Sequence, residues 1–242
     1  MNSRYLELDL LRTLAIAMMI IFHAAFDLQT IYGWDIDTFS GGWLLLQQAT
    51  VTLFLLLVGA SFAISWKRHR EKHPNRSFLG LYKKYVKRGV FVVACGMLVS
   101  AVTYFAEPET YVRFGILQMI GVSILLLPFF ARLREWNILL SIPLIALGPV
   151  VFEMRSGNPL LLPLGIMSPN FATVDYIPLI PWFGVVLMGY AIGYLVYVRH
   201  SPMFLKEGQV VRVLSWPGRH ALIIYLIHQP ILLGIFGFIG FF

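Results

Sequence analysis

The chain has 242 residues, of which 58% are hydrophobic and 13% charged, and its mean hydropathy is +0.75. A soluble domain of this length would need far more polar surface, so the composition excludes one and indicates an integral membrane protein. The formal net charge is +7. The basic residues behind it gather on one side of the membrane, as shown below, so the charge does not require a nucleic-acid partner and we expect none.

Seven segments are apolar enough to cross a bilayer, which takes about 20 mostly apolar residues. Their apolar runs are continuous and do not alternate, which excludes the strands of a membrane barrel. The predicted fold class is therefore an all-α polytopic membrane protein with a single domain over residues 1–242. The expected spans are about 9–31, 43–65, 89–106, 112–131, 136–153, 177–198 and 219–241.

The first predicted span carries four ionisable residues, which are functional candidates by default inside a membrane. Asp9, Arg12, His23 and Asp27 lie within roughly 60° of one line along a helix, and Arg12 and His23 are about 16 Å apart along it. We therefore expect one polar stripe that faces a groove in the bundle. The alternatives are an Asp9–Arg12 ion pair at the helix end, a packing role for His23, and Asp27 marking the outer membrane edge.

His23 and Asp27 are also one helical turn apart. A carboxylate at that distance orients an imidazole that acts as a general base and stabilises its cation. The pattern predicts His23 and Asp27 as the catalytic pair, facing a cavity and within hydrogen-bond reach of each other or of a shared water.

The segment "WKRHREKHPNRSFLGLYKKYVKRG" between the second and third spans has nine Lys and Arg residues and one acid. Its second half, 78–88, is spaced like an interfacial amphipathic helix, whose cations either anchor lipid headgroups or gather a phosphorylated ligand. Seven spans place this segment, the amino terminus, the 132–135 turn and the 199–218 loop on one side. Counting Arg12 and Arg219 at the helix ends, that side holds 17 of the 19 Lys and Arg residues. The positive-inside rule makes that side cytoplasmic.

A second polar cluster lies in "WPGRHALIIYLIHQPILL" at the last span. Arg219 and His220 are at its cytoplasmic end, His228 and Gln229 are near mid-membrane, and Pro230 is expected to kink the helix. Gln47 and Gln48 in the second span and Arg113 at the outer edge of the fourth are further candidates for substrate binding. For the glutamines the alternative is interhelical hydrogen bonding, and for Arg113 it is an interface anchor. The sequence contains no clustered set of Cys, His and carboxylate ligands, so we predict no metal site.

The outer segment 153–178 is apolar and rich in proline. Irregular backbone is not tolerated in contact with lipid, so we expect this segment to fold back into the membrane or to cap the outer face.

Several stretches resemble a known family. "YLELDLLRTLAIAMMIIFHAAFDL" followed by "FLLLVGASFAIS" resembles the opening of the transmembrane acyltransferase superfamily, which has an acidic–x–x–Arg start and a histidine eleven residues later. "RFGILQMIGVSILL", "DYIPLIPWFGVVLMGYAIG" and "GRHALIIYLIHQP" resemble small prokaryotic relatives of heparan-alpha-glucosaminide N-acetyltransferase. The resemblance covers nearly the whole chain and is carried by the order and spacing of these motifs.

The resemblance implies a cytoplasmic acyl-CoA donor such as acetyl-CoA, an acceptor reached from the other side, and a location in the plasma membrane. His23 matches the essential histidine of the first helix, and Arg12 matches the arginine thought to meet the CoA phosphates. One departure is that "DTFSGGWLLLQQ" contains no histidine where the lysosomal enzyme has its catalytic one, so that role falls to His23.

The spacing of residues agrees with this implication, because the offset from Arg12 to His23 resembles the reach of a pantetheine arm. Asp9, Arg219 and His220 would lie beside Arg12 at the phosphates, and His23 would accept a proton from a hydroxyl or amine or take the acyl group itself. Gln47, Gln48 or Gln229 would meet the oxyanion. The acceptor is a glycan or another small polar molecule, and a homodimer is left open.

Three other functions remain as alternatives. A proton-coupled transporter would also use His23 and Asp27, although the chain shows no inverted repeat. A b-type haem protein would use His23 and His228 as axial ligands. A receptor or a structural membrane protein leaves the polar stripe unexplained.

Overall fold

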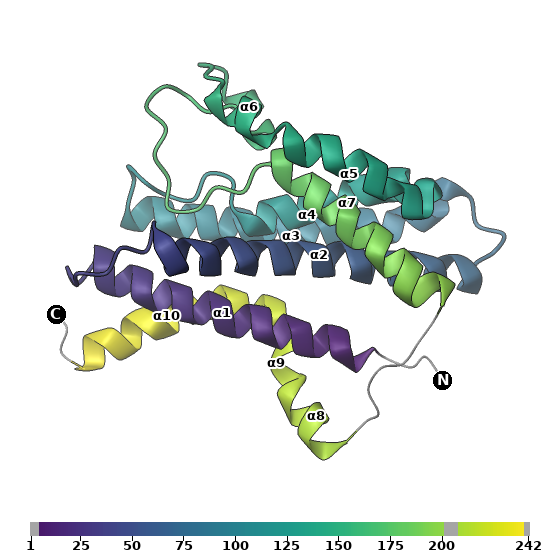
Figure 1. The fold of residues 1–242 in the computed structure, drawn as a ribbon, viewed down its shortest axis with the longest axis horizontal. Coiled ribbons are helices and arrows are strands. Elements are labelled where there is room, and N and C mark those ends of the chain that lie inside the picture. Colours follow the sequence, from purple (N-terminus) through teal and green to yellow (C-terminus); the bar gives the residue numbers. More distant parts are fainter. Residues whose placement is uncertain (1–4, 201–207, 240–242) are drawn as a thin grey trace. The chain divides into compact units, whose positions relative to one another are not determined.

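The structure is a computed structural model that describes residues 5–200 and 208–239. The last residues of the predicted span 219–241 and part of the predicted 199–218 loop lie outside the described residues. Helices make up nearly all of the regular structure (Figure 1): α1 Leu6–Thr30, α2 Gly41–Lys72, α3 Phe78–Ala106, α4 Ile116–Phe130, η1 Ala131–Trp136, α5 Asn137–Ala146, α6 Gly148–Glu153, η2 Pro159–Leu164, α7 Leu179–Gly193, η3 Tyr194–Arg199, α8 Gln209–Leu214, α9 Trp216–Arg219 and α10 Ala221–Ile239.

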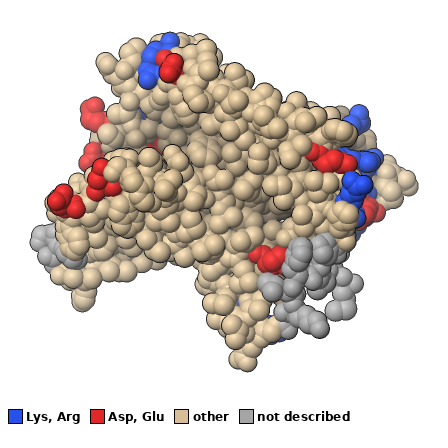
Figure 2. Space-filling model, viewed as in Figure 1, with Lys and Arg blue, Asp and Glu red and all other residues tan. Residues whose placement is uncertain are grey.

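Among the described residues, six helices are long and apolar enough to cross a membrane: Leu6–Thr30, Gly41–Lys72, Phe78–Ala106, Ile116–Glu153, Leu179–Arg199 and Ala221–Ile239. The predicted all-α polytopic class is confirmed. Uncharged side chains cover most of the face drawn in Figure 2, as expected for helices that lie in lipid. The count differs from seven because the predicted spans 112–131 and 136–153 fall in the single stretch Ile116–Glu153.

That stretch is interrupted at Arg134, where φ is 50° and ψ is −126°. The Asn137 side chain, fully buried, donates hydrogen bonds to the carbonyls of Phe130 at 3.0 Å and Arg134 at 2.8 Å. These bonds satisfy carbonyls freed by the break, and the chain turns back from α4 into α5 (Figure 1). The predicted turn at 132–135 is therefore present, between two short helical legs.

The chain forms two compact units, Met1–Phe54 with Met203–Phe242, and Leu55–Pro202. In the first unit α1 packs against α8, α9 and α10. In the second unit α3 packs on α4, and α5 packs on α7. The first unit therefore joins the two ends of the chain.

Glycines set close helix crossings in the second unit. A Cβ atom built on Gly189 of α7 would lie 2.2 Å from the Leu56 carbonyl oxygen of α2, and one on Gly59 would lie 2.1 Å from the Val186 carbonyl oxygen. A Cβ on Gly121 of α4 would lie 2.8 Å from the Gly89 carbonyl oxygen of α3. Small residues allow this approach, and close packing replaces the hydrophobic driving force that lipid removes.

The basic segment between the second and third predicted spans is mostly helical. α2 continues to Lys72, and α3 begins at Phe78 with Ser77 as its N-cap, whose hydroxyl accepts from the Gly80 N–H at 3.3 Å. The predicted amphipathic helix 78–88 is therefore confirmed as a helix, but it is the first three turns of α3 and is continuous with the span.

The loops that precede α4 and α7 in the second unit are joined by a short parallel contact. Phe114 and Tyr176 form an isolated bridge, the Val174 N–H donates to the Thr110 carbonyl at 2.8 Å, and the Ile177 N–H donates to the Phe114 carbonyl at 2.9 Å. The segment before α7 thus holds the residues that precede α4. Whether residues 153–178 fold back into the membrane or cap the outer face stays a prediction.

Candidate active site

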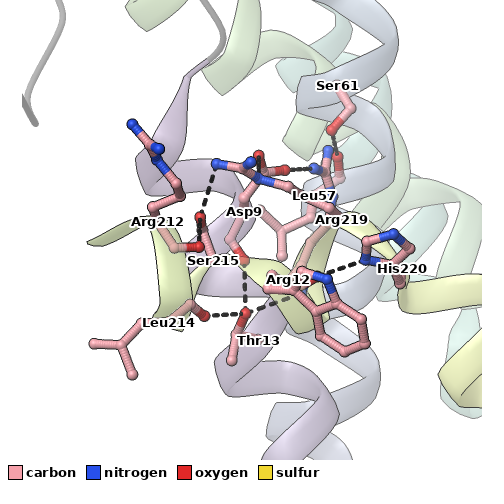
Figure 3. Close-up of polar contacts among 12 residues, drawn as sticks. Asp9, Arg12, Thr13, Leu57, Ser61, Arg212, Leu214, Ser215, Arg219 and His220 are labelled. Atoms are coloured by element: carbon pink, nitrogen blue, oxygen red, sulfur yellow. Dashed lines mark hydrogen bonds and ion pairs between the residues drawn. The ribbon is translucent and has the colours of Figure 1, made fainter. Parts of the chain in front are cut away.

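The first polar cluster surrounds Asp9, near the start of α1 (Figure 3). Asp9 is 1% exposed, and its Oδ1 pairs with Nη1 of Arg12 at 2.5 Å. Its Oδ2 lies 3.7 Å from Nε of Arg219, which comes from α9. One buried carboxylate therefore holds two arginines together, and each arginine side chain keeps 25% of its surface exposed.

Arg219 is further fixed by its own short helix. Its Nη2 donates to the Ser215 hydroxyl at 3.0 Å, and that hydroxyl donates to the Arg212 carbonyl at 3.1 Å. His220 follows, with its Nδ1 at 2.9 Å from the Trp216 carbonyl and its ring 4.5 Å from that of Trp216. The structure therefore brings Asp9, Arg12 and Arg219 together, while the His220 ring contacts Trp216, one turn earlier in the chain.

The second polar cluster joins the carboxyl-terminal half of α1 to α10. The Asp27 side chain is 1% exposed, and its Oδ1 accepts from Nε2 of Gln229 at 2.6 Å. The rings of His23 and His228 lie 4.9 Å apart, edge to face. The four residues predicted here on two separate spans are therefore neighbours.

Asp27 does not bond to His23, although the two are one turn apart. Within residues 5–200 and 208–239, His23 makes ring contacts with Phe22 and His228 and no hydrogen bond. The Asp27 carboxylate is turned instead toward α10. The ring separation of His23 and His228 is also too short to hold an iron atom between them, so the geometry does not favour axial haem ligation by this pair.

Three acceptor atoms in this cluster are buried and have no hydrogen-bond partner in the described part of the chain: Asp27 Oδ2, His228 Nε2 and Gln229 Oε1. His228 Nδ1 lies 2.6 Å from the Tyr225 carbonyl. A carbonyl only accepts, so Nδ1 carries the proton and Nε2 of the neutral ring is an acceptor. Buried acceptors without donors are costly, so this cluster is suited to a group that supplies N–H or O–H.

The remaining predicted residues are not members of these two clusters. Gln47 is half-buried, Gln48 is exposed, and neither makes a side-chain hydrogen bond to another described residue. Arg113 belongs to the second unit, where its guanidinium lies over the rings of Tyr111 at 5.1 Å and Phe171 at 5.3 Å. Its Nε is buried without a hydrogen-bond partner among the described residues.

Asp175, close to Arg113, was not singled out from the sequence. Its Oδ2 accepts from the Ile116 N–H at 3.2 Å, and it occupies space that Gly115 leaves free, since a Cβ there would lie 2.5 Å from Oδ2. Burial raises the pKa of Asp175 to about 6, and the Ile116 hydrogen bond lowers it by less. The carboxylate therefore caps the amino-terminal end of α4, although burial makes its charged form less favourable.

We expect Asp175→Asn to flatten the pH dependence of the protein's stability. A carboxyl whose pKa is higher in the folded protein contributes stability at low pH, and that contribution is lost as the pH rises from about 4 through 6. Above pH 6 the variant should melt at a higher temperature than the wild type, because asparagine still accepts from the Ile116 N–H without charge. Thermal unfolding between pH 4.5 and 8 measures this, and identical pH profiles would contradict it.

Sequence reasoning missed the residues that join the helices. Thr13 and Gly218 connect α1 to α9, and Ser215 holds Arg219 of α9. Small residues of this kind are common in membrane helices, so no pattern distinguishes them. The proline in "WPGR" was a usable signal, since it starts a new short helix at Trp216.

The fold and the two clusters define a polytopic α-helical membrane protein that holds ionisable groups inside one of its helical units. The family model of heparan-alpha-glucosaminide N-acetyltransferase, catalytic, matches residues 4–230, so the chain belongs to this family of membrane acetyltransferases. No curated protein and no solved structure matches the chain.

Proposed function

We propose that the chain transfers an acyl group, normally acetyl, from cytoplasmic acyl-CoA to a hydroxyl or amine of a small polar acceptor. The acceptor, a sugar among the candidates, is reached from the outer side of the plasma membrane. Membership of the family supports acetyl transfer in general terms. The donor, the acceptor and the orientation rest on the geometry of the two clusters and on the distribution of charge.

The donor end is supported by Arg12 and Arg219. Both guanidinium groups are partly exposed and are anchored on one buried carboxylate. Planar guanidinium forks suit the oxygens of a diphosphate, and a shared anchor lets two of them stay close despite their like charge. Asp9 is therefore proposed to position the pair, and His220 to lie at its edge.

The observation that carries the proposal concerns the end where the acyl acceptor would bind. Three buried hydrogen-bond acceptor atoms beside His23 have no hydrogen-bond donor in the described structure. A substrate hydroxyl or amine would supply the missing donors. Arg12 and His23 are eleven residues apart on one continuous helix, or about 16 Å, which a pantetheine arm spans. The thioester of a CoA bound at the arginines would therefore reach His23.

In the proposed reaction, His23 takes the proton of the acceptor hydroxyl or amine as its oxygen or nitrogen attacks the thioester carbonyl. The carbon–sulfur bond then breaks, and the CoA thiolate leaves and receives the proton from His23. Asp27 and Gln229 hold the acceptor through the free Oδ2 and Oε1 atoms, and His228 contributes Nε2. Gln47, Gln48 and Arg113 remain proposed contacts for the oxyanion and the acceptor.

The proposed orientation follows the basic residues. The turn between α2 and α3 and the start of α1 would face the cytoplasm, and the loops that carry Asp175 and Arg113 would face outward. We propose that residues 1–242 act as one catalytic domain.

The proposal is tested by titrating acetyl-CoA into the purified protein. We expect Arg12→Ala to weaken binding by about 10- to 100-fold, since a charge-assisted hydrogen bond contributes about 1.5–3 kcal/mol. Arg12→Lys should restore only part of this affinity, because lysine lacks the planar fork. Calorimetry on variants with unchanged melting temperature measures the effect.

The matched control is Arg132→Ala, which removes an exposed arginine and the same charge. It should bind acetyl-CoA as the wild type does. A wild type that binds no acetyl-CoA would overturn the proposed donor. Equal losses of affinity in both alanine variants would mean that Arg12 acts only through its charge and does not contact the donor.

A further inference from the structure

One hydroxyl connects α1 to the short helices that precede the last span (Figure 3). Thr13 Oγ1 lies 2.8 Å from the Leu214 carbonyl, to which it donates, and it accepts from the Gly218 N–H at 3.0 Å. It also lies 3.1 Å from the Asp9 carbonyl of its own helix. A hydroxyl has one proton and two lone pairs, so these contacts use its hydrogen-bonding capacity almost fully.

The same junction requires a glycine. Gly218 approaches α1 so closely that a Cβ atom there would lie 1.9 Å from the Asp9 carbonyl oxygen and 3.1 Å from Cβ of Arg12. The backbone of α9 therefore lies directly against the turn of α1 that carries the buried carboxylate. Any side chain at this position would push α9 away from α1.

This junction determines the position from which the Arg219 side chain extends. Arg219 follows Gly218 directly, and its guanidinium is held from two sides, by Asp9 Oδ2 and by the Ser215 hydroxyl. Ser215 is fully buried and is the residue after Leu214, whose carbonyl receives the Thr13 proton. Thr13 and Ser215 thus fix the two ends of α9, and Arg219 is set against Asp9 as a result.

We propose that Thr13, together with Ser215, is a positioning residue for the phosphate-binding arginines. This inference rests on the proposed function. Neither hydroxyl touches the donor. They hold Arg219 beside Arg12 before CoA arrives, so binding does not have to order a long side chain, whose rotamer freedom is worth about 2 kcal/mol.

The test is a double-mutant cycle on acetyl-CoA affinity. Thr13→Val keeps the branched shape and removes the hydroxyl, and we expect it to weaken binding about tenfold, the equivalent of one lost hydrogen bond. Thr13→Ser keeps the hydroxyl and should bind as the wild type does. In an Arg219→Gln background, Thr13→Val should cost almost nothing more, because the residue through which it acts is already gone.

A second measurement separates positioning from a general loss of stability. Each lysine or arginine that contacts phosphates adds to the salt dependence of binding, so Thr13→Val should reduce the slope of log Kd against log salt to that of Arg219→Gln. A destabilised fold with an intact phosphate site would leave the slope unchanged. Where Thr13→Val does not fold, Ser215→Ala replaces it in the same cycle, since it removes the hydroxyl that accepts from Arg219 Nη2 and donates to the Arg212 carbonyl, and leaves the contacts of Thr13 in place.

Coupling between position 13 or 215 and Arg219, with rescue by serine at 13, would support the proposal. Additive losses, or a salt slope that stays at the wild-type value, would overturn it while leaving acetyl-CoA as the donor. A wild type that binds no acetyl-CoA would instead overturn the proposed function on which the inference depends.

Discussion

His23→Ala is expected to lower the rate of acetyl transfer by about 1,000-fold while acetyl-CoA binds as before. Proton transfer by a positioned side chain contributes about 10²- to 10⁴-fold, and His23 is the half-buried imidazole beside the three acceptor atoms without donors. The arginine cluster lies about three helical turns away and is not altered. Transfer from radiolabelled acetyl-CoA to an acceptor, with parallel calorimetry, measures both quantities.

His200→Ala is the matched control, because His200 is an exposed histidine of the second unit and should be replaceable without loss of rate. Asp27→Asn should retain a residual rate, since Gln229 can still donate to the asparagine oxygen. Removing a member of a buried polar group can destabilise a protein, so melting temperatures are compared alongside. Full turnover by His23→Ala would end the proposed chemistry.

Gly189→Ala is expected to destabilise the second unit strongly. Its new methyl group would overlap the Leu56 carbonyl, 2.2 Å away, which is backbone and has no rotamer by which to move. Overpacking costs about 1–3 kcal/mol and sometimes more, so the apparent melting temperature should fall by about 5–10 °C. Thermal unfolding in detergent, followed by size-exclusion chromatography, measures it.

Gly234→Ala is the control, because Gly234 lies inside α10 and a Cβ atom there meets nothing within 4 Å. Alanine favours a helix over glycine, so this variant should be as stable as the wild type or slightly more so. If both variants melt together, then α2 and α7 do not cross as closely as the glycines indicate.

The fold could be predicted from sequence where one local property decides it. A continuous apolar run predicts a spanning helix, and each of the seven predicted segments overlaps helical residues in the described chain. The exact ends could not be predicted, since α2 continues through charged residues to Lys72 and α3 begins at Phe78. Charged residues are good helix formers, so hydropathy marks the membrane and does not mark the helix end.

The site could be predicted only in part, for a related reason. The contact of Asp9 with Arg12 depends on spacing within one helix, which the sequence contains. The bond of Asp27 to Gln229, and not to His23, depends on how α1 packs against α10, which no periodicity encodes. Geometry within one turn favoured His23, but a donor from another helix proved to be the partner of Asp27.

The pairing of the chain's two ends also affects how the protein is made. Gln229 is 202 residues away from Asp27, and Gly218 is 205 residues away from Thr13. At about 5–20 residues per second, a ribosome needs about 10–40 s to synthesise the partners of a helix that has already been inserted. Until then the Asp27 carboxylate has no donor from α10, and an unpaired carboxylate in lipid is unfavourable. Nascent chains that stop before α10 would therefore carry a polar group in α1 that lacks the partner it has in the folded protein.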